Sequence, residues 1–269
     1  RGGDYPHTRG LGGRFGSHEI VYDACGAEAA FATILEDRPF QACEFSLANY
    51  TMLRDRGAHR LIAIPVFQNR AFRHGVAWVP QASPLEDLAA LCGKRVGVKE
   101  YSQTAAVWFR GLLGDEYGLD WRDVRWVAPQ KQRFAPPAEA AVESTQADLE
   151  ALALEGGIDA YVATRVTRPG LRPLLRDVRA AESAYFARTG ILPINHAVVL
   201  DRAVLDGAQA VFDAYCAAGD RHRHGLDDAN RANVETLLRY LHEQCLVARR
   251  YGADDLFALE DARDAPHAV

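Results

Sequence analysis

The chain lacks the features that mark membrane-spanning, disulfide-stabilised and nucleotide-binding proteins. No apolar run approaches 18 residues, so no membrane-spanning helix is predicted. The five cysteines are widely spaced and form no CxxC pair, which argues against a disulfide framework or a zinc ribbon. GxGxxG, Walker, HExxH and GxSxG patterns are absent too. We therefore expect reduced thiols and neither a metal nor a redox or nucleotide cofactor.

Strong positive charge is also missing. Lys plus Arg number 31 against 36 for Asp plus Glu, a formal net charge of −5, which does not favour nucleic acid as a partner. The 269 residues are 48% apolar and 25% charged, typical of one large or two medium globular domains. No signal peptide is visible. We expect a cytoplasmic protein that binds neither membrane nor nucleic acid.

Short apolar segments alternate with helical patterns along most of the chain, which predicts an α/β fold with parallel sheets. Pro136-Pro137 places the stretch 130–141 in a loop. The predicted strands are 19–23, 42–45, 61–67, 75–79, 95–98, 124–127, 158–163 and 197–200. The predicted helices are 28–36, 47–56, 84–88, 104–117, one from Ser144 or Thr145 to Glu155, and 228–248.

Two arginines and a histidine, Arg70, Arg73 and His74, follow the predicted strand 61–67. Ligands of open α/β sheets bind beyond the carboxyl ends of strands. Two guanidinium groups there suit a dicarboxylate, and an imidazole can deliver a proton near neutral pH. Surface arginines and a structural histidine are the alternative.

Small polar residues, Ser102, Gln103 and Thr104, open the predicted helix 104–117. We expect at least one of them to cap the helix. The N–H groups of the first turn can in addition bind a carboxylate.

Two further polar pairs lie at predicted strand ends. Glu44 and Ser46 end the strand 42–45, where they could orient a ring hydroxyl or a histidine. Asn195 and His196 follow Pro193 in a turn before the strand 197–200, where His196 could act as acid, base or ligand. Structural or exposed roles remain open for each. The run from Arg221 to His224 is weak evidence for a metal, because no Cys, Asp or Glu stands at matching spacing.

An ordered series of motifs resembles the 4,5-dihydroxyphthalate decarboxylase family. The resemblance spans almost the whole chain. It rests on Gly3-Asp4-Tyr5, Ala63-Ile-Pro-Val-Phe, Arg70-Ala-Phe-Arg-His74, Gly93-Lys-Arg-Val-Gly-Val, Glu100-Tyr, Thr104-Ala-Ala-Val-Trp-Phe-Arg-Gly111, Asp115-Glu-Tyr-Gly118, Gly190-Ile-Leu-Pro-Ile-Asn-His196, Asn230-Arg231 and Leu256-Phe257.

The resemblance implies a two-lobed, type II periplasmic-binding-protein-like fold with a cleft between the lobes. Lobe one would comprise residues 1–78 plus 195–269, and lobe two residues 79–194. The implied reaction is non-oxidative decarboxylation of a hydroxylated aromatic (di)carboxylate, such as 4,5-dihydroxyphthalate to protocatechuate. A solute-binding protein for an aromatic carboxylate, or another lyase such as a dehydratase, are the alternatives. We also expect a homo-oligomer.

Roles for the site residues follow as hypotheses. Arg70 and Arg73 clamp carboxylates, and His74 or His196 donates the proton. Glu44 and Ser46 orient hydroxyls. Gln103 and Thr104 bind a carboxylate, and Asn195 also contacts the substrate.

Overall fold

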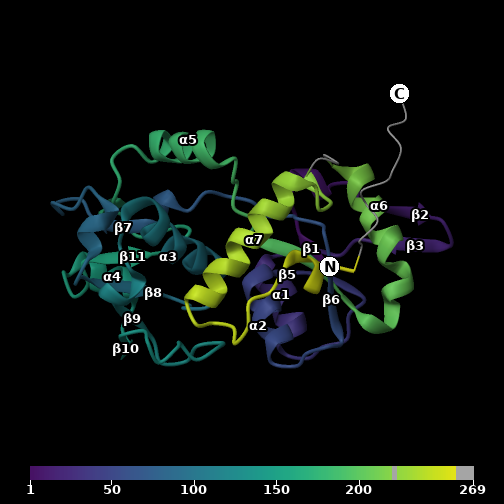
Figure 1. The fold of residues 1–269 in the computed structure, drawn as a ribbon, viewed down its shortest axis with the longest axis horizontal. Helices are drawn as coiled ribbons and strands as arrows, with labels where there is room; N and C mark the ends of the chain where they lie inside the picture. Colours follow the sequence, from purple (N-terminus) through teal and green to yellow (C-terminus); the bar gives the residue numbers. More distant parts are fainter. Residues whose placement is uncertain (220–222, 259–269) are drawn as a thin grey trace. The chain divides into compact units, whose positions relative to one another are not determined.

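The computed structural model describes residues 1–219 and 223–258, and the chain divides into two compact units (Figure 1). Unit 1 comprises residues 1–70 and 194–238 and the chain from 249 onward, and unit 2 comprises 71–193 and 239–248. Relative to the predicted lobes, residues 71–78 and 239–248 fall in unit 2. No described helix is both long enough and apolar enough to cross a membrane.

The central sheet of unit 1 has the strand order β5-β13-β6, with β5 at Ala42–Ser46, β13 at His196–Asp201 and β6 at Leu61–Ile64. β13 runs antiparallel to both neighbours, which corrects the prediction of purely parallel sheets. The strands β5 and β6, which are joined through a helix, run parallel to each other. β13, which comes much later in the chain, lies between them. The carboxyl ends of β5 and β6 therefore meet the amino end of β13 at one edge.

Helices and short strands surround this sheet in unit 1. The helix α1 packs against β5, and α6 packs against the hairpin of β2 and β3. A buried apolar cluster that includes Ile64, Val198 and Phe212 forms part of the core. The bounds are β1 Gly2–Gly3, β2 Gly12–Phe15, β3 His18–Val21, β4 Ala24–Cys25, α1 Ala27–Leu35, α2 Leu47–Asp55 and α6 Ala208–Ala218.

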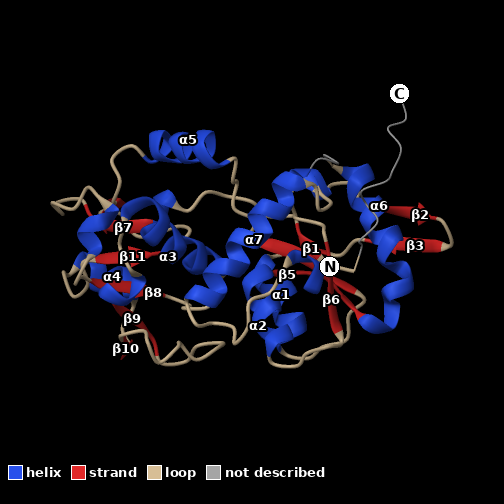
Figure 2. Ribbon diagram, viewed as in Figure 1, coloured by secondary structure: helices blue, strands red, loops and turns tan. Residues whose placement is uncertain are grey.

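Unit 2 contains a mixed sheet of order β10-β9-β8-β11-β7-β12 (Figure 2). The strands β8 to β11 run parallel to one another, and β7 and β11 pair antiparallel, as do β7 and β12. The bounds are β7 Ala77–Pro80, β8 Arg95–Val98, α3 Thr104–Tyr117, β9 Arg125–Pro129, β10 Val142–Thr145, α4 Leu149–Leu154, β11 Ala160–Val162, β12 Leu171–Pro173 and α5 Val178–Thr189.

The helix α3 begins and ends where the sequence predicts. Gly118 stops it in the left-handed conformation, with φ at 62°, which costs glycine little. The prediction of a helix from Ser144 or Thr145 is wrong, because these residues form the edge strand β10. Asp148 instead caps α4, its Oδ1 accepting a hydrogen bond from the N–H of Ala151 at 2.8 Å.

The last long helix, α7, spans Asp228–Glu243 and ends before the predicted boundary at 248. The apolar residues Val234, Leu237, Leu238 and Leu241 of this helix are buried, whereas Cys245 lies beyond the helix with φ at 55°. Residues 84–87 form no helix; a 3-10 helix follows at Leu88–Leu91. The sequence reasoning also missed α5 and α6.

Candidate active site

Five of the predicted site residues lie at one edge of the central sheet of unit 1: Glu44, Ser46, Arg70, Asn195 and His196. His196 opens β13 directly opposite Ser46 at the end of β5. Paired residues share a face of a sheet, as do residues two apart on one strand. Glu44, Ser46 and His196 therefore share one face.

Glu44 forms the centre of a hydrogen-bonded network on this face. Its side chain is fully buried, and Oε1 lies 2.7 Å from Nδ1 of His196. The Tyr5 hydroxyl donates to the same oxygen at 2.8 Å. The N–H of Gly3 donates to Oε2 at 2.7 Å. The carboxylate thus has three donors in a water-poor environment.

These contacts decide the charge of Glu44 and the tautomer of His196. Burial alone would raise the pKa of Glu44, but the hydrogen bond and charge of His196, with the bonds from Gly3 and Tyr5, lower it below its ordinary value. An ionised carboxylate only accepts hydrogen bonds, so Nδ1 of His196 must carry a proton.

The other ring nitrogen, Nε2, lies outside this network. No described residue donates to it or accepts from it, and the His196 side chain is 16% exposed. Phe31 packs against the ring edge-on, with centroids 5.0 Å apart. The imidazole is therefore held by Glu44 and Phe31, and part of its side chain stays exposed.

The strand β1 can approach Glu44 closely because it consists of two glycines, Gly2 and Gly3. A Cβ on Gly2 would lie 2.6 Å from the Tyr22 hydroxyl, and one on Gly3 would lie 2.5 Å from the Tyr5 ring. Larger residues would push the strand away and remove the Gly3 contact. The sequence reasoning assigned no role to Tyr5, although Gly3-Asp4-Tyr5 was part of the family resemblance.

Ser46 and Asn195 are buried beside this network. Ser46 is the N-cap of α2, and its hydroxyl accepts from the N–H of Asn49 at 3.2 Å. Asn195 joins three segments through its backbone, because its carbonyl accepts from Leu47 and its N–H donates to Asn69. These contacts fix the turn that carries His196.

Arg70 belongs to the same edge of unit 1. It pairs with Ile194 in an antiparallel bridge, two residues before His196. Strand alternation places it on the face of Glu44 and His196. Its Nη2 donates to Oδ1 of Asn230 at 2.5 Å, and its guanidinium lies 5.3 Å from the centre of the Phe67 ring. The cation is thus held at this edge by Asn230 and Phe67.

Arg73 and His74 lie in unit 2, and both are buried. Burial, assisted by the charge of Arg188, lowers the pKa of His74 to about 4, and its Nδ1 has no hydrogen-bond partner among the described residues. The ring lies 5.1 Å from that of Tyr185. Burial lowers the pKa of Arg73 to about 10, against the opposing charge of Glu182. His74 is therefore a neutral, enclosed imidazole at neutral pH.

The start of α3 differs from the predicted cap. Gln103 occupies the N-cap position without a side-chain capping bond, and the Ser102 hydroxyl donates to Oε1 of Glu100 at 2.7 Å. Thr104, the first helical residue, is buried. The N–H of Ala106 in the first turn donates to the carbonyl of Gln103 at 2.8 Å. The positive end of a helix dipole favours anions, so this terminus stays a predicted carboxylate-binding element of unit 2.

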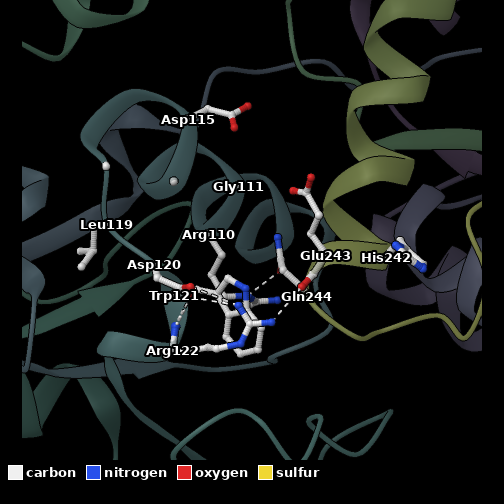
Figure 3. A pocket seen from close by; sticks show the side chains of 12 residues that line it. Arg110, Gly111, Asp115, Leu119, Asp120, Trp121, Arg122, His242, Glu243 and Gln244 are labelled. Atoms are coloured by element: carbon white, nitrogen blue, oxygen red, sulfur yellow. Dashed lines mark hydrogen bonds and ion pairs between the residues drawn. The ribbon is translucent and has the colours of Figure 1, made fainter.

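A hollow of about 660 Å³ in unit 2 contains none of the predicted residues (Figure 3). It lies between the end of α3 and the end of α7, where Nε of the buried Arg110 donates to Gln244 at 2.7 Å. The hydrogen-bonded pair of Glu44 and His196 lies in unit 1. Across residues 1–219 and 223–258, no group of three or more His, Cys, Asp or Glu is placed to hold a metal. Arg221 and His222 lie outside the described residues, and Nδ1 of His224 accepts from the N–H of Phe67.

Comparison with known proteins identifies the family. The chain is 32% identical over 175 residues to a 4,5-dihydroxyphthalate decarboxylase of Pseudomonas putida, covering 59% of this chain and 68% of that protein. The chain belongs to the 4,5-dihydroxyphthalate decarboxylase family. A member from Comamonas testosteroni is 27% identical over 262 residues, covering 90% of this chain and 78% of that protein. The enzyme is accordingly a carboxy-lyase. No protein-family model matches it.

Solved structures confirm the predicted periplasmic-binding-protein-like α/β fold of this family member. The periplasmic aliphatic sulphonate binding protein SsuA of Escherichia coli superposes with a TM-score of 0.54 at 15% identity, over 83% of this chain and 81% of that one. The periplasmic sulfonate-binding protein SsuA of Methylobacillus flagellatus superposes with a TM-score of 0.52 at 11% identity, over 89% of this chain and 79% of that one. At such identities the likeness concerns the fold alone.

Proposed function

We propose that this enzyme removes carbon dioxide from a hydroxylated aromatic (di)carboxylate, with 4,5-dihydroxyphthalate as the first candidate and protocatechuate as its product. The Glu44–His196 hydrogen bond carries the proposal, because it provides an oriented imidazole in a family of decarboxylases. No redox step is required. The reaction replaces a carboxylate on the ring by a proton.

The chemistry requires a proton at one ring carbon. A ring hydroxyl raises the electron density at the carbon that bears the carboxylate. That carbon takes a proton, and the bond to the carboxylate then breaks, its electron pair returning to the ring as carbon dioxide leaves. An acid near this carbon and a cation for the carboxylates are the groups that the enzyme must provide.

We assign proton delivery to His196. The ionised Glu44 accepts from Nδ1 and stabilises the imidazolium, so that Nε2 is the nitrogen that gives its proton to the ring carbon. Solvent can restore that proton, because the side chain is partly exposed. Glu44 itself is enclosed by donors and acts on the substrate only through His196.

His74 is less suited to this role. An imidazole whose pKa is about 4 holds little of its acidic form at neutral pH. Its ring is also buried against Tyr185, without access to a substrate. Its contribution is therefore to the packing of unit 2.

Arg70 supplies positive charge on the face that carries His196. Hydrogen bonds between charged groups contribute about 1.5–3 kcal/mol each, enough to favour an anionic substrate over a neutral analogue. We propose that Arg70 binds a substrate carboxylate and that Ser46 and Asn195 keep the surrounding turn in place. A guanidinium group favours binding of a carboxylate over binding of an uncharged solute.

The test is a panel of aromatic acids analysed by mass spectrometry. 4,5-Dihydroxyphthalate, its monohydroxy and unsubstituted analogues and protocatechuate are incubated with the enzyme, with and without a chelator. Loss of carbon dioxide from the hydroxylated acids, and none from unsubstituted phthalate, supports the proposal. Loss of water would indicate a dehydratase, and tight binding of every acid without turnover would indicate a solute-binding protein.

A further inference from the structure

Tyr5 holds Glu44 through a hydrogen bond from its hydroxyl. Its hydroxyl donates to Oε1 at 2.8 Å, and the same oxygen lies 2.7 Å from Nδ1 of His196. We propose that Tyr5 is a positioning residue whose phenol keeps the Glu44 carboxylate ionised and in line with His196. The inference rests on the proposed function for its effect on turnover, but not for its effect on Glu44.

The placement of the donors explains why the phenol matters. A carboxylate has about four lone-pair positions, and the three described donors divide them between the two oxygens. Gly3 fixes Oε2, so rotation of the carboxylate is limited from that side. Tyr5 and His196 together fix Oε1. Without the phenol, the carboxylate can turn away from the imidazole, and a larger share of its charge is left unsolvated.

Tyr5 is itself held rigidly. Its N–H donates to Oγ1 of Thr8 at 3.0 Å, and its ring stacks on the ring of His7 with centroids 5.1 Å apart and planes 3° from parallel. Burial, with the negative charge of Glu44, raises the pKa of the phenol above its ordinary value. The hydroxyl therefore remains a donor at any pH at which the enzyme works.

Several other titratable groups face Glu44 and must be considered in any titration. His196 contributes from β13 and Cys43 from β5 itself. The charge of Glu44 also affects the pKa values of His7, Tyr22, Cys25 and Tyr215. Among the residues that the structure describes, only Tyr5 and His196 bond to the carboxylate through side chains. Tyr5 is thus the neutral group whose removal affects Glu44 directly.

The experiment compares Tyr5→Phe with the matched variant Tyr22→Phe. Tyr22 belongs to the same N-terminal region, and its hydroxyl donates to the carbonyl of Gly3 at 2.8 Å without touching Glu44. Side-chain carboxyl carbons of glutamate are labelled with carbon-13, and Glu44 is assigned as the resonance that Glu44→Gln removes. The spectrum is followed from neutral pH down to the lowest pH at which each protein stays folded, and kcat and KM are measured on the best acid of the panel.

We expect Glu44 to titrate about one pH unit higher in Tyr5→Phe than in the wild type, since each unit is a tenfold change in the protonation equilibrium. Tyr22→Phe should leave the titration in place. Tyr5→Phe should also lower kcat about tenfold with little change in KM. Equal titration in both variants and the wild type, or equal shifts in both variants, would overturn the inference, as would wild-type kcat in Tyr5→Phe. If no acid is decarboxylated, the proposed function fails, while the titration still decides the role of Tyr5.

Discussion

Glu44 and His196 are separated by 152 residues in the chain and by 2.7 Å in space, between Oε1 and Nδ1. The pairing exists because β13 returns between β5 and β6 and runs opposite to both. A carboxylate that accepts from Nδ1 fixes the tautomer of the imidazole and leaves Nε2 outside this hydrogen bond. The proton transfer that we propose for His196 depends on this relationship.

Replacing Glu44 by Gln should lower kcat about a hundredfold, within the range that acid–base groups contribute. The amide keeps the size of the side chain but removes the charge that stabilises the imidazolium. Steady-state kinetics on the decarboxylated acid provides the measurement. Glu36→Gln, which changes an exposed ion pair with Arg38 in the same unit, should retain wild-type kcat. Equal activity of both variants would show that Glu44 has no part in turnover.

Replacing Arg70 by Lys should raise KM about tenfold or more and change kcat little. Lysine keeps the charge but cannot offer the planar pair of donors that a carboxylate accepts. Arg231→Lys changes a partly exposed ion pair with Asp254 and is the matched control, with KM expected at the wild-type value. Unchanged KM in Arg70→Lys would exclude Arg70 as a carboxylate ligand.

His74 should make unit 2 sensitive to acid. Burial lowers the pKa of His74 to about 4, whereas an unfolded histidine titrates near 6.5. The unfolded chain therefore binds this proton first as the pH falls. The stability from neutral His74 is complete above about pH 6.5 and is lost between there and about pH 4.

Urea unfolding at intervals across that range measures the effect. His74→Leu should flatten the fall in unfolding free energy between about pH 6.5 and pH 4, because the titrating group is gone. The exposed His59, replaced by Asn, should leave the slope as in the wild type. Parallel curves for His74→Leu and the wild type would contradict a buried neutral imidazole at this position.

Two glycines of α3, one packed against a neighbour and one open, test how closely this helix packs. A Cβ on Gly111 would lie 2.3 Å from the Tyr240 ring, whereas one on Gly114 would meet nothing within 4 Å. Gly111→Ala should destabilise the protein by about 1–3 kcal/mol through this overlap. Gly114→Ala should stabilise it by about 0.5–1 kcal/mol, because alanine is the better helix former. Denaturant titration gives both values, and the same sign for the two variants would refute the close packing of Tyr240 on α3.

Several helices and strands could be located from short stretches of the sequence alone. Gly118 located the end of α3, and short apolar segments located β5 and β13. Glu44 and His196 were each singled out as polar residues at strand ends. Their contact was not predictable from spacing, because it depends on the order and direction of strands brought together from distant parts of the chain.

The failures have equally local causes. Ser144 and Thr145 suit a helix cap, but pairing of β10 with β9 outweighs that preference, and Asp148 caps α4 instead. Tyr5 resembles any half-buried aromatic residue until the fold places its hydroxyl at Glu44. Arg73 and His74 follow an apolar run as ligand-binding residues often do; the structure buries both in unit 2, and their binding roles stay predictions.

The most direct test is carbon dioxide release from 4,5-dihydroxyphthalate by the wild-type enzyme, His196→Gln and His74→Gln, each verified as folded. We predict turnover by the wild type, a loss of about a hundredfold or more in His196→Gln, and near wild-type kcat in His74→Gln. Wild-type turnover in His196→Gln, above all if His74→Gln were inactive, would contradict the assignment of proton delivery to His196 and Glu44.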